Sequence, residues 1–170
     1  DIGCGNGALC RDLTERGYFV VGVEPSESGI RHSVESVPDG VFYKLGIYDD
    51  PGLISQDDFD IAVSTEVVEH LFKPHELLSF AKSKLKNNGI FIISTPYHGY
   101  FKNLLISIFN KWDNHHQPLN DGGHIKFWSK KSLSNLLEAN GFEVIGYRGA
   151  GRFPWLWKSM GLIARKRVTD

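Results

Sequence analysis

Short apolar runs alternate along the chain with segments whose apolar residues recur at helical spacing. Residues 19–23 form a β-branched run without polar alternation, which predicts a strand covered on both faces. Leu9 and Leu13 lie four positions apart ahead of Gly17, which predicts a helix that ends near this glycine. The chain therefore begins with the helix and strand of an α/β unit.

The same cycle continues through most of the remaining sequence. Further strands are expected at 41–45, 59–64, 90–94, 142–147 and 160–164, and further helices at 25–36, 74–85 and 130–140. Strands that alternate with helices indicate a parallel sheet with right-handed crossovers. The last two strands are joined by a loop rich in Gly, Pro and Trp, so we expect an antiparallel pair there. These patterns predict a three-layer, doubly wound, Rossmann-like α/β fold, mostly parallel with an antiparallel last strand.

The cycle breaks after the strand at 90–94. Apolar residues recur at helical spacing in this region, at Phe101, Leu104, Leu105, Ile108, Phe109 and Trp112. Such a stripe is usually core, but its position favours one amphipathic helix within a lid insertion at about 97–124, covering an apolar substrate. A membrane-surface role has less support, because only Lys102 and Lys111 flank the stripe.

Length and composition indicate one domain, 1–170, with 41% hydrophobic residues. Asp1 and Ile2 resemble the end of a strand whose beginning is absent, so we expect an N-terminally truncated chain. No apolar run reaches the roughly 20 residues that span a bilayer, which predicts a soluble protein without a transmembrane segment. Cys4 and Cys10 have no second pair, which favours a reducing, cytoplasmic setting.

The near-zero net charge conceals an uneven distribution. Residues 1–70 carry 4 Lys and Arg against 14 Asp and Glu, whereas residues 71–170 carry 15 against 6. An acidic half suits a cationic ligand, and a basic half attracts an anionic one. We expect the two halves to interleave in space, so that the charges cancel.

Glycines punctuate the first seven residues, Asp1-Ile2-Gly3-Cys4-Gly5-Asn6-Gly7, between a strand and a helix. Glycine lets the backbone turn sharply and lets a ligand approach closely. Glu24 ends the next strand, from which a carboxylate reaches ribose hydroxyls. Asp1 would repel a pyrophosphate but can pair with an ammonium group. The loop therefore favours a cationic adenosine derivative over a dinucleotide.

Four strings in order resemble those of the class I S-adenosylmethionine-dependent methyltransferases. They are DIGCGNG at 1–7, VVGVEPS at 20–26, FDIAVSTEVVEHL at 59–71, and HIKFWS at 124–129 followed by a helix and Gly141-Phe142. The E-x-x-E-H string and the late His-x-x-Phe element are most similar to the small-molecule branch that includes ubiquinone-type O-methyltransferases. The resemblance implies a methyltransferase fold that uses S-adenosyl-L-methionine, releases S-adenosyl-L-homocysteine and methylates a small-molecule acceptor, on oxygen rather than nitrogen.

The resemblance also implies which residues bind the cofactor: Asp1, Gly3, Cys4, Gly5, Glu24, Pro25, Tyr48, Asp49, Thr65 and Glu66. In relatives the glycine loop lines the methionine part, and the acid at Glu24 holds the ribose. Tyr48 and Asp49 fall where relatives place adenine contacts. Thr65 and Glu66 correspond to positions at the sulfonium end.

Catalysis of methyl transfer requires an aligned nucleophile and gains from a base whose pKa lies near the working pH. Glu66, Glu69 and His70 stand at i, i+3 and i+4, which predicts one side of a helical turn. This group suits cofactor contact, a base with an orienting carboxylate, or a divalent cation, and we expect no metal. His124 is predicted to act as the base or to position the acceptor, the alternative being a hydrogen bond that fixes its loop.

Other residues are further pocket candidates or are expected to be structural. Tyr97 and His98 follow a strand and are predicted to reach the pocket. The adjacent His115 and His116 are expected to lie in a polar loop and not to face one site.

Alternative functions remain at this level. They are a non-catalytic S-adenosylmethionine-binding module, an RNA or protein N-methyltransferase, and, with least support, a dehydrogenase. The net charge of −1 gives little support to a nucleic-acid partner. The oligomeric state is open, with a homodimer as one option.

Overall fold

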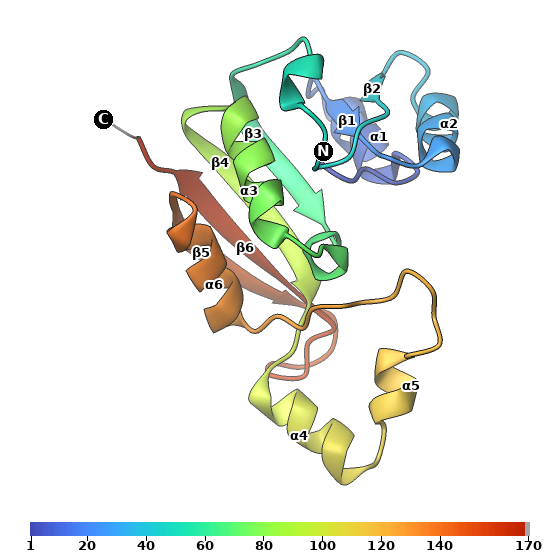
Figure 1. Cartoon of the computed structure of the whole chain (residues 1–170), viewed down its shortest axis with the longest axis vertical. Helices are drawn as coiled ribbons and strands as arrows, with labels where there is room; N and C mark the ends of the chain where they lie inside the picture. Colours follow the sequence, from blue (N-terminus) through green and yellow to red (C-terminus); the bar gives the residue numbers. More distant parts are fainter. Residues whose placement is uncertain (169–170) are drawn as a thin grey trace.

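The computed structural model describes residues 1–168 as an α/β fold (Figure 1). The strands are β1 (Val21–Val23), β2 (Val41–Tyr43), β3 (Phe59–Thr65), β4 (Leu85–Pro96), β5 (Phe142–Ala150) and β6 (Ser159–Lys166). The helices are α1 (Ala8–Glu15), α2 (Glu27–Ser36), α3 (Pro74–Lys84), α4 (Tyr100–Ile108), α5 (Trp112–His116) and α6 (Lys130–Ala139). Two short 3-10 helices, η1 (Pro51–Leu53) and η2 (Val68–His70), precede α3.

The backbone of Ile2 connects two groups of strands into one sheet surface. Ile2 pairs in parallel with Val23 of β1, and its N–H donates to the carbonyl of Val63 in β3 at 2.8 Å. On the other side of β3 the strands run in the order β3-β4-β6-β5, and β2 lies beyond β1. Strand β6 lies between β4 and β5 and is antiparallel to both, whereas the pairs β1–β2 and β3–β4 are parallel. The predicted mostly parallel fold with an antiparallel last strand is confirmed.

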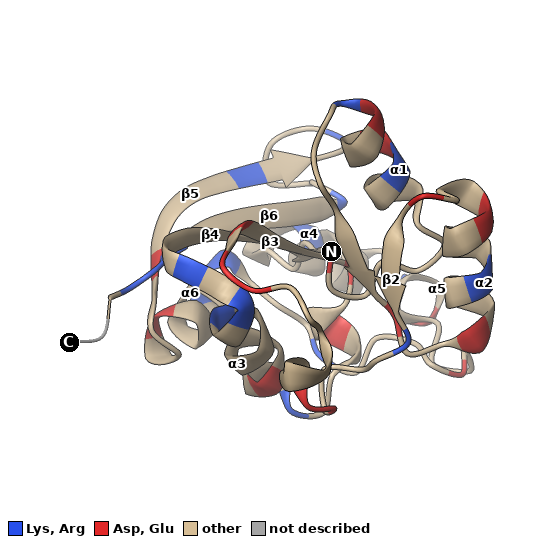
Figure 2. Cartoon of the chain, turned by 90° about the horizontal axis from the view of Figure 1, so that it is seen from above, with Lys and Arg blue, Asp and Glu red and all other residues tan. Residues whose placement is uncertain are grey.

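Helices pack on the sheet through apolar faces. In Figure 2, α3 and α6 lie on one side of the sheet and α1 lies on the other. Leu77 and Leu78 of α3 and Leu133 and Leu137 of α6 are fully buried, as is Phe91 of β4. Burying each such side chain contributes about 1.5–3 kcal/mol. This layer fixes the strand ends from which the site is built.

The predicted helices α3 and α6 begin at the expected residues, whereas the first two strands are shorter than predicted. β1 pairs only over Val21–Val23, with β2, and Phe19 is 69% exposed. The β-branched residues favour an extended backbone, but a strand also needs a neighbour with which to exchange hydrogen bonds. The predicted strands at 19–23 and 41–45 therefore shrink to three residues each.

Strand β4 is longer than predicted. The Asn-Asn-Gly sequence at 87–89 indicated a turn, yet β4 runs from Leu85. The pairing of β3 with β4 skips from Phe59–Leu85 to Ile61–Ile90, and Asn88 takes a φ of +61°. The turn residues thus form an irregularity inside a strand, which Asn tolerates through its left-handed conformation.

The insertion contains two helices where one was predicted. α4 and α5 lie beyond the carboxyl ends of β3 and β4 (Figure 1). The apolar stripe is not core: Phe101, Ile108 and Phe109 are 58%, 63% and 65% exposed. That this insertion covers an apolar substrate stays a prediction. In residues 1–168, no helix has the length and apolar character needed to cross a membrane.

The two charge halves do not interleave, contrary to expectation. All of β1, β2 and β3 come from residues 21–65, and all of β4, β5 and β6 come from residues 85–166. The chain fills one end of the sheet before it begins the other, so the acidic and basic halves occupy different ends. Figure 2 shows the acidic and basic residues on the ribbon.

Candidate active site

The glycine loop turns sharply between Ile2 and α1. Gly3 and Gly5 have φ values of +79° and +55°, a backbone conformation that is strained for residues with a side chain. A Cβ on Gly3 would lie 2.5 Å from Val67 Cγ2, whereas a Cβ on Gly5 would meet nothing within 4 Å. Gly3 is therefore needed for packing, and Gly5 faces open space into which a ligand can approach.

The carboxylate of Glu24 is fixed beside this loop by two backbone donors. Gly5 N–H donates to Oε2 at 3.1 Å, and Ser26 N–H donates to Oε1 at 3.0 Å. Pro25 is exposed next to it, and a Cβ on Gly46 would lie 3.6 Å from Pro25 Cβ. The fold thus brings together the glycine loop, the acid that directly follows β1 and the loop after β2.

Asp1 and Cys4 take different parts in the loop. Asp1 Oδ2 accepts a hydrogen bond from Cys10 Sγ at 3.5 Å, while Oδ1 is buried without a partner in the described chain. Cys4 is 7% exposed, and its Sγ lies 3.8 Å from Ser33 Oγ. Its side chain therefore packs inward, leaving the backbone of Cys4 as the part that a ligand could contact. A buried carboxylate oxygen without a donor suits a cationic or N–H-bearing ligand.

Tyr48 and Asp49 lie in a turn held by their own side chains. Asp49 Oδ2 accepts from Gly46 N–H at 2.7 Å, and Tyr48 Oη accepts from Lys73 N–H at 3.2 Å. Tyr48 is 57% exposed. Because one oxygen of the Asp49 carboxylate is hydrogen-bonded within the turn, the groups most available to a ligand are the Tyr48 ring and the backbone.

Thr65 is the last residue of β3 and Glu66 follows it; both are exposed. Glu66 has a φ of +55°, and its Oε1 accepts from Ser94 Oγ at 2.9 Å and from Ser159 Oγ at 2.7 Å. Neither serine was predicted as a partner of Glu66. Ser159 comes from β6, 93 residues away, so no local signal could have indicated it.

Glu69 and His70 lie in η2, and His124 joins them from the loop before α6. The imidazole rings of His70 and His124 are 4.9 Å apart, and His70 Nε2 lies 3.9 Å from Glu69 Oε1. The predicted helical turn that would include Glu66 is wrong. The helix covers only Val68–His70, and Glu66 precedes it in a left-handed conformation. His124 therefore takes the place in the cluster that the spacing gave to Glu66.

Hydrogen bonds fix the orientation of this cluster. The backbone N–H groups of Ile125 and Lys126 both donate to the carbonyl of Glu69 at 3.0 Å, which ties the late loop to η2. His70 Nδ1 lies 2.9 Å from the carbonyl of Gly122, so Nδ1 carries the proton and Nε2 is left as the acceptor. The late loop thus both supplies His124 and sets the tautomer of His70.

Protonation in the cluster is shifted by its surroundings. Glu69 is 1% exposed, neither carboxylate oxygen has a hydrogen-bond partner in residues 1–168, and burial raises its pKa to about 7. Burial first and then the charge of His70 lower the pKa of His124. Each of the three side chains offers a ligand atom within 4.8 Å of the others, so the same group could hold a divalent cation. As placed, it combines a His124 imidazole that is neutral at pH 7 with a carboxyl group that titrates near neutral pH.

A second group of polar side chains borders this cluster and encloses a pocket of about 250 Å³. We call it the basic pocket; its lining includes Lys102, Arg152, Lys158 and the imidazoles of His98, His115, His116 and His124. The expectation that His115 and His116 would not face one site is wrong. They end the five-residue helix α5, and their rings lie 5.8 and 5.7 Å from that of His98. Tyr97, the other pocket candidate, instead packs on Trp157, with ring centroids 5.2 Å apart.

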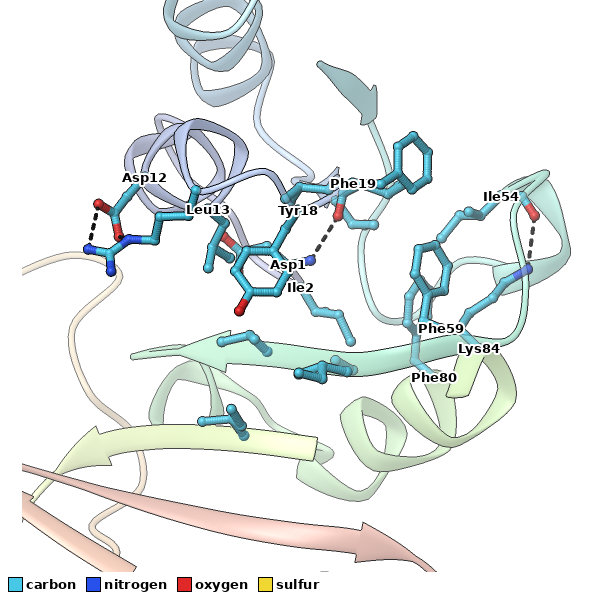
Figure 3. Close-up of a pocket in the computed structure, with 18 residues that line it drawn as sticks. Asp1, Ile2, Asp12, Leu13, Tyr18, Phe19, Ile54, Phe59, Phe80 and Lys84 are labelled. Carbon is cyan, nitrogen blue, oxygen red and sulfur yellow. Dashed lines mark hydrogen bonds and ion pairs between the residues drawn. The ribbon is translucent and has the colours of Figure 1, made fainter. Parts of the chain in front are cut away.

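A larger cavity of about 540 Å³ lies away from these groups (Figure 3). Ile2 and residues of α1, β1, β3 and α3 line it, and the lining is mainly apolar, with Tyr18, Phe19, Phe59 and Phe80 among its residues. Of the predicted cofactor residues only Asp1 lines it. The larger of these two cavities is therefore not the one at the candidate active site.

Comparisons with known proteins agree on the family to which these features point. A family model described as a methyltransferase domain matches residues 1–146. The chain is similar to ubiquinone biosynthesis O-methyltransferases of Maricaulis maris (35% identity over 100 residues, 56% of this chain) and Bartonella quintana (29% over 152 residues, 85% of this chain). It spans 39% and 60% of the length of these two relatives.

The fold has a counterpart among solved structures. A SAM-dependent methyltransferase from Archaeoglobus fulgidus superposes with a TM-score of 0.74 at 19% identity, over 98% of this chain and 84% of that one. At this level of identity the likeness concerns the fold.

Proposed function

The chain belongs to the class I S-adenosylmethionine-dependent methyltransferases, and from this premise we propose that it transfers a methyl group to an oxygen atom of a small-molecule acceptor. The observation that carries the proposal is the pair of imidazoles, His70 and His124, 4.9 Å apart beside the buried Glu69. Such a group can take a proton from a hydroxyl at neutral pH. The two curated relatives named as O-methyltransferases support oxygen as the atom methylated.

The glycine loop and its neighbours form the proposed cofactor site. S-adenosylmethionine supplies an electrophilic methyl group on a sulfonium ion. Asp1, Gly3, Gly5 and the backbone of Cys4 would hold the methionine part, because Asp1 Oδ1 is unpaired in the described chain and Gly5 faces open space. Glu24, oriented by two N–H donors, would bind the ribose hydroxyls.

The remaining proposed cofactor contacts lie on either side of Glu24. Pro25, Tyr48 and Asp49 would border the adenine, since the turn at Gly46 lies beside Pro25. Thr65 and Glu66 would lie at the sulfonium end, with Glu66 held by two serine hydroxyls. Fixing these groups before the ligand arrives reduces the entropy lost on binding.

His124 is the proposed base. Because its pKa is lowered, the ring is neutral at pH 7 and can accept the proton of the acceptor hydroxyl as the oxygen attacks the methyl carbon. His70, whose Nδ1 is engaged by Gly122, would position His124 and the acceptor oxygen through its ring. Glu69 would stabilise positive charge as it develops on the imidazoles, which favours its ionised form.

An acceptor panel tests this function. The purified protein is incubated with methyl-labelled S-adenosylmethionine and, separately, catechol, phenol, benzoate and benzylamine, and methylated product and S-adenosylhomocysteine are measured. We expect methyl ether from a hydroxylated ring. Product from benzylamine alone would favour an N-methyltransferase, and cofactor binding without product would favour a non-catalytic module. Absence of cofactor binding would contradict the proposed site itself.

The setting of the reaction is part of the proposal. Cys4 and Cys10 are free and buried, which suits a reducing, cytoplasmic environment. A small molecule is the proposed partner, since the groups that meet at the base enclose a pocket and not an extended surface.

A further inference from the structure

The basic pocket contains a buried ammonium group whose charge the protein does not neutralise. Lys102 of α4 is 6% exposed, and its Nζ donates to the carbonyl of Tyr97 at 2.7 Å. Among residues 1–168 it makes no salt bridge. Burying a cation without an opposite charge is costly, so this group is incomplete as it stands.

A second buried lysine shows how the same chain satisfies such a group. Lys84 of α3 is 7% exposed, and its Nζ bonds to the carbonyls of Ile54 and Gln56 and to the Asp57 carboxylate at 2.7 Å. Lys84 thus has three partners, one of them anionic, where Lys102 has one neutral partner. By this comparison Lys102 lacks an anionic partner, so the pocket is suited to bind a negatively charged group.

Two further cations face the same space. Arg152 and Lys158, from the segment between β5 and β6, line the pocket, and no carboxylate is among its lining residues. Burial first and then Arg152 lower the pKa of Lys102, and the charge of Glu66, which does not line the pocket, opposes this lowering. An anion bound among the three cations would favour the charged form of Lys102.

The imidazoles of the pocket add hydrogen-bonding capacity without adding positive charge. Burial and the neighbouring Lys102 lower the pKa values of His98 and His115 to about 4, so both rings are neutral at pH 7. His116 Nε2 is buried and has no partner in the described part of the chain. Neutral rings can donate to an anionic oxygen, and they can also accept from a protonated one.

We propose that the basic pocket binds a phosphate ester group carried by the methyl acceptor. A phosphate monoester brings about −1.5 to −2 charges and three strong acceptor oxygens, which matches three cations and several ring N–H groups better than the single charge of a carboxylate does. The proposal rests on the proposed function, because His124 belongs both to this pocket and to the cluster with Glu69 and His70. The phosphate would thus anchor the acceptor while its hydroxyl meets the base.

Direct binding tests the pocket independently of turnover. Phenyl phosphate, benzoate and phenol are titrated calorimetrically into the protein, with and without saturating S-adenosylhomocysteine. Vesicles with and without phosphatidic acid form a further arm. The doubly substituted variant Arg152→Gln/Lys158→Gln replaces two exposed charges with neutral polar side chains, and Lys111→Gln removes an exposed charge outside the pocket. Lys102→Met is a third variant, compared only if its circular dichroism matches that of the wild type.

We expect phenyl phosphate to bind at least tenfold more tightly than benzoate or phenol, and at least tenfold more weakly to the double variant than to Lys111→Gln. Rising salt should weaken it, because the contacts are charged. Binding of phenyl phosphate alone supports a soluble phosphate ester, and added binding of the phosphatidic acid vesicles supports a lipid headgroup. Equal affinities for phenyl phosphate and phenol, or no loss in the double variant, would overturn the proposal. Loss of S-adenosylhomocysteine binding with phosphate binding intact would instead count against the proposed function.

Discussion

Replacing Glu69 by Gln should stabilise the protein at neutral pH, and by an amount that depends on pH in a defined direction. Glu69 is 1% exposed and its carboxylate oxygens have no hydrogen-bond partner among the described residues. Burial therefore favours the protonated form and raises the pKa from 4.5 to about 7. Gln keeps the shape of the protonated side chain and never ionises.

The sign and size follow from proton linkage. Below pH 4.5 the carboxyl is protonated in both the folded and the unfolded chain, so the wild type and the variant should differ little. Between pH 4.5 and 7 the unfolded chain releases this proton while the folded chain keeps it, so the wild type loses stability as pH rises. At about 1.36 kcal/mol for each pH unit, the span from 4.5 to about 7 corresponds to about 3 kcal/mol. Above pH 7 the difference should stay constant.

Urea unfolding followed by tryptophan fluorescence, at half-unit steps from pH 4.5 to 8, measures this difference. A chelator is included, because a cation held by Glu69, His70 and His124 would neutralise the carboxylate. Glu138→Gln, an exposed substitution on α6, serves as the control and should give a difference that is flat with pH. A flat difference for Glu69→Gln as well, or a variant that becomes less stable relative to the wild type as pH rises, would refute the assignment of Glu69 as a buried, unpaired acid.

Three other perturbations separate the parts of the site. Glu24→Ala should weaken S-adenosylhomocysteine binding by about 1–3 kcal/mol in calorimetry, whereas the exposed Glu27→Ala should not; equal affinities would remove Glu24 from the ribose site. His124→Ala should lower kcat by about 10²–10⁴-fold with cofactor affinity unchanged, and a collapse of affinity would make its role structural. Gly3→Ala should lower thermal stability by about 2 kcal/mol or more through its 2.5 Å contact. Gly5→Ala should lower stability by only about 1–2 kcal/mol of backbone strain but should block cofactor binding. A larger loss of stability for Gly5→Ala than for Gly3→Ala would contradict the open space at Gly5.

Features encoded by neighbouring residues were predictable. The helices α3 and α6 begin at Pro74 and Lys130 as expected, because a proline at the first helical position and a Ser129 cap act within one turn. The meeting of the glycine loop with Glu24 follows from the strand–helix–strand order, since parallel strands end at the same edge of a sheet. The strand lengths at β1 and β4 were not predictable, because they depend on which neighbour supplies hydrogen bonds.

What the sequence determined by itself is the α/β order, the glycine loop and the acid that directly follows β1, since each depends on contacts within a few residues or on a fixed unit of structure. Only the tertiary structure decided that His124 joins Glu69 and His70, and that Ser159 holds Glu66. These partners come from a late loop and from the antiparallel strand β6, far along the chain. Whether such residues meet depends on how the insertion and the last strands pack against the sheet. The residue pattern within the insertion or within the last strands does not encode this packing.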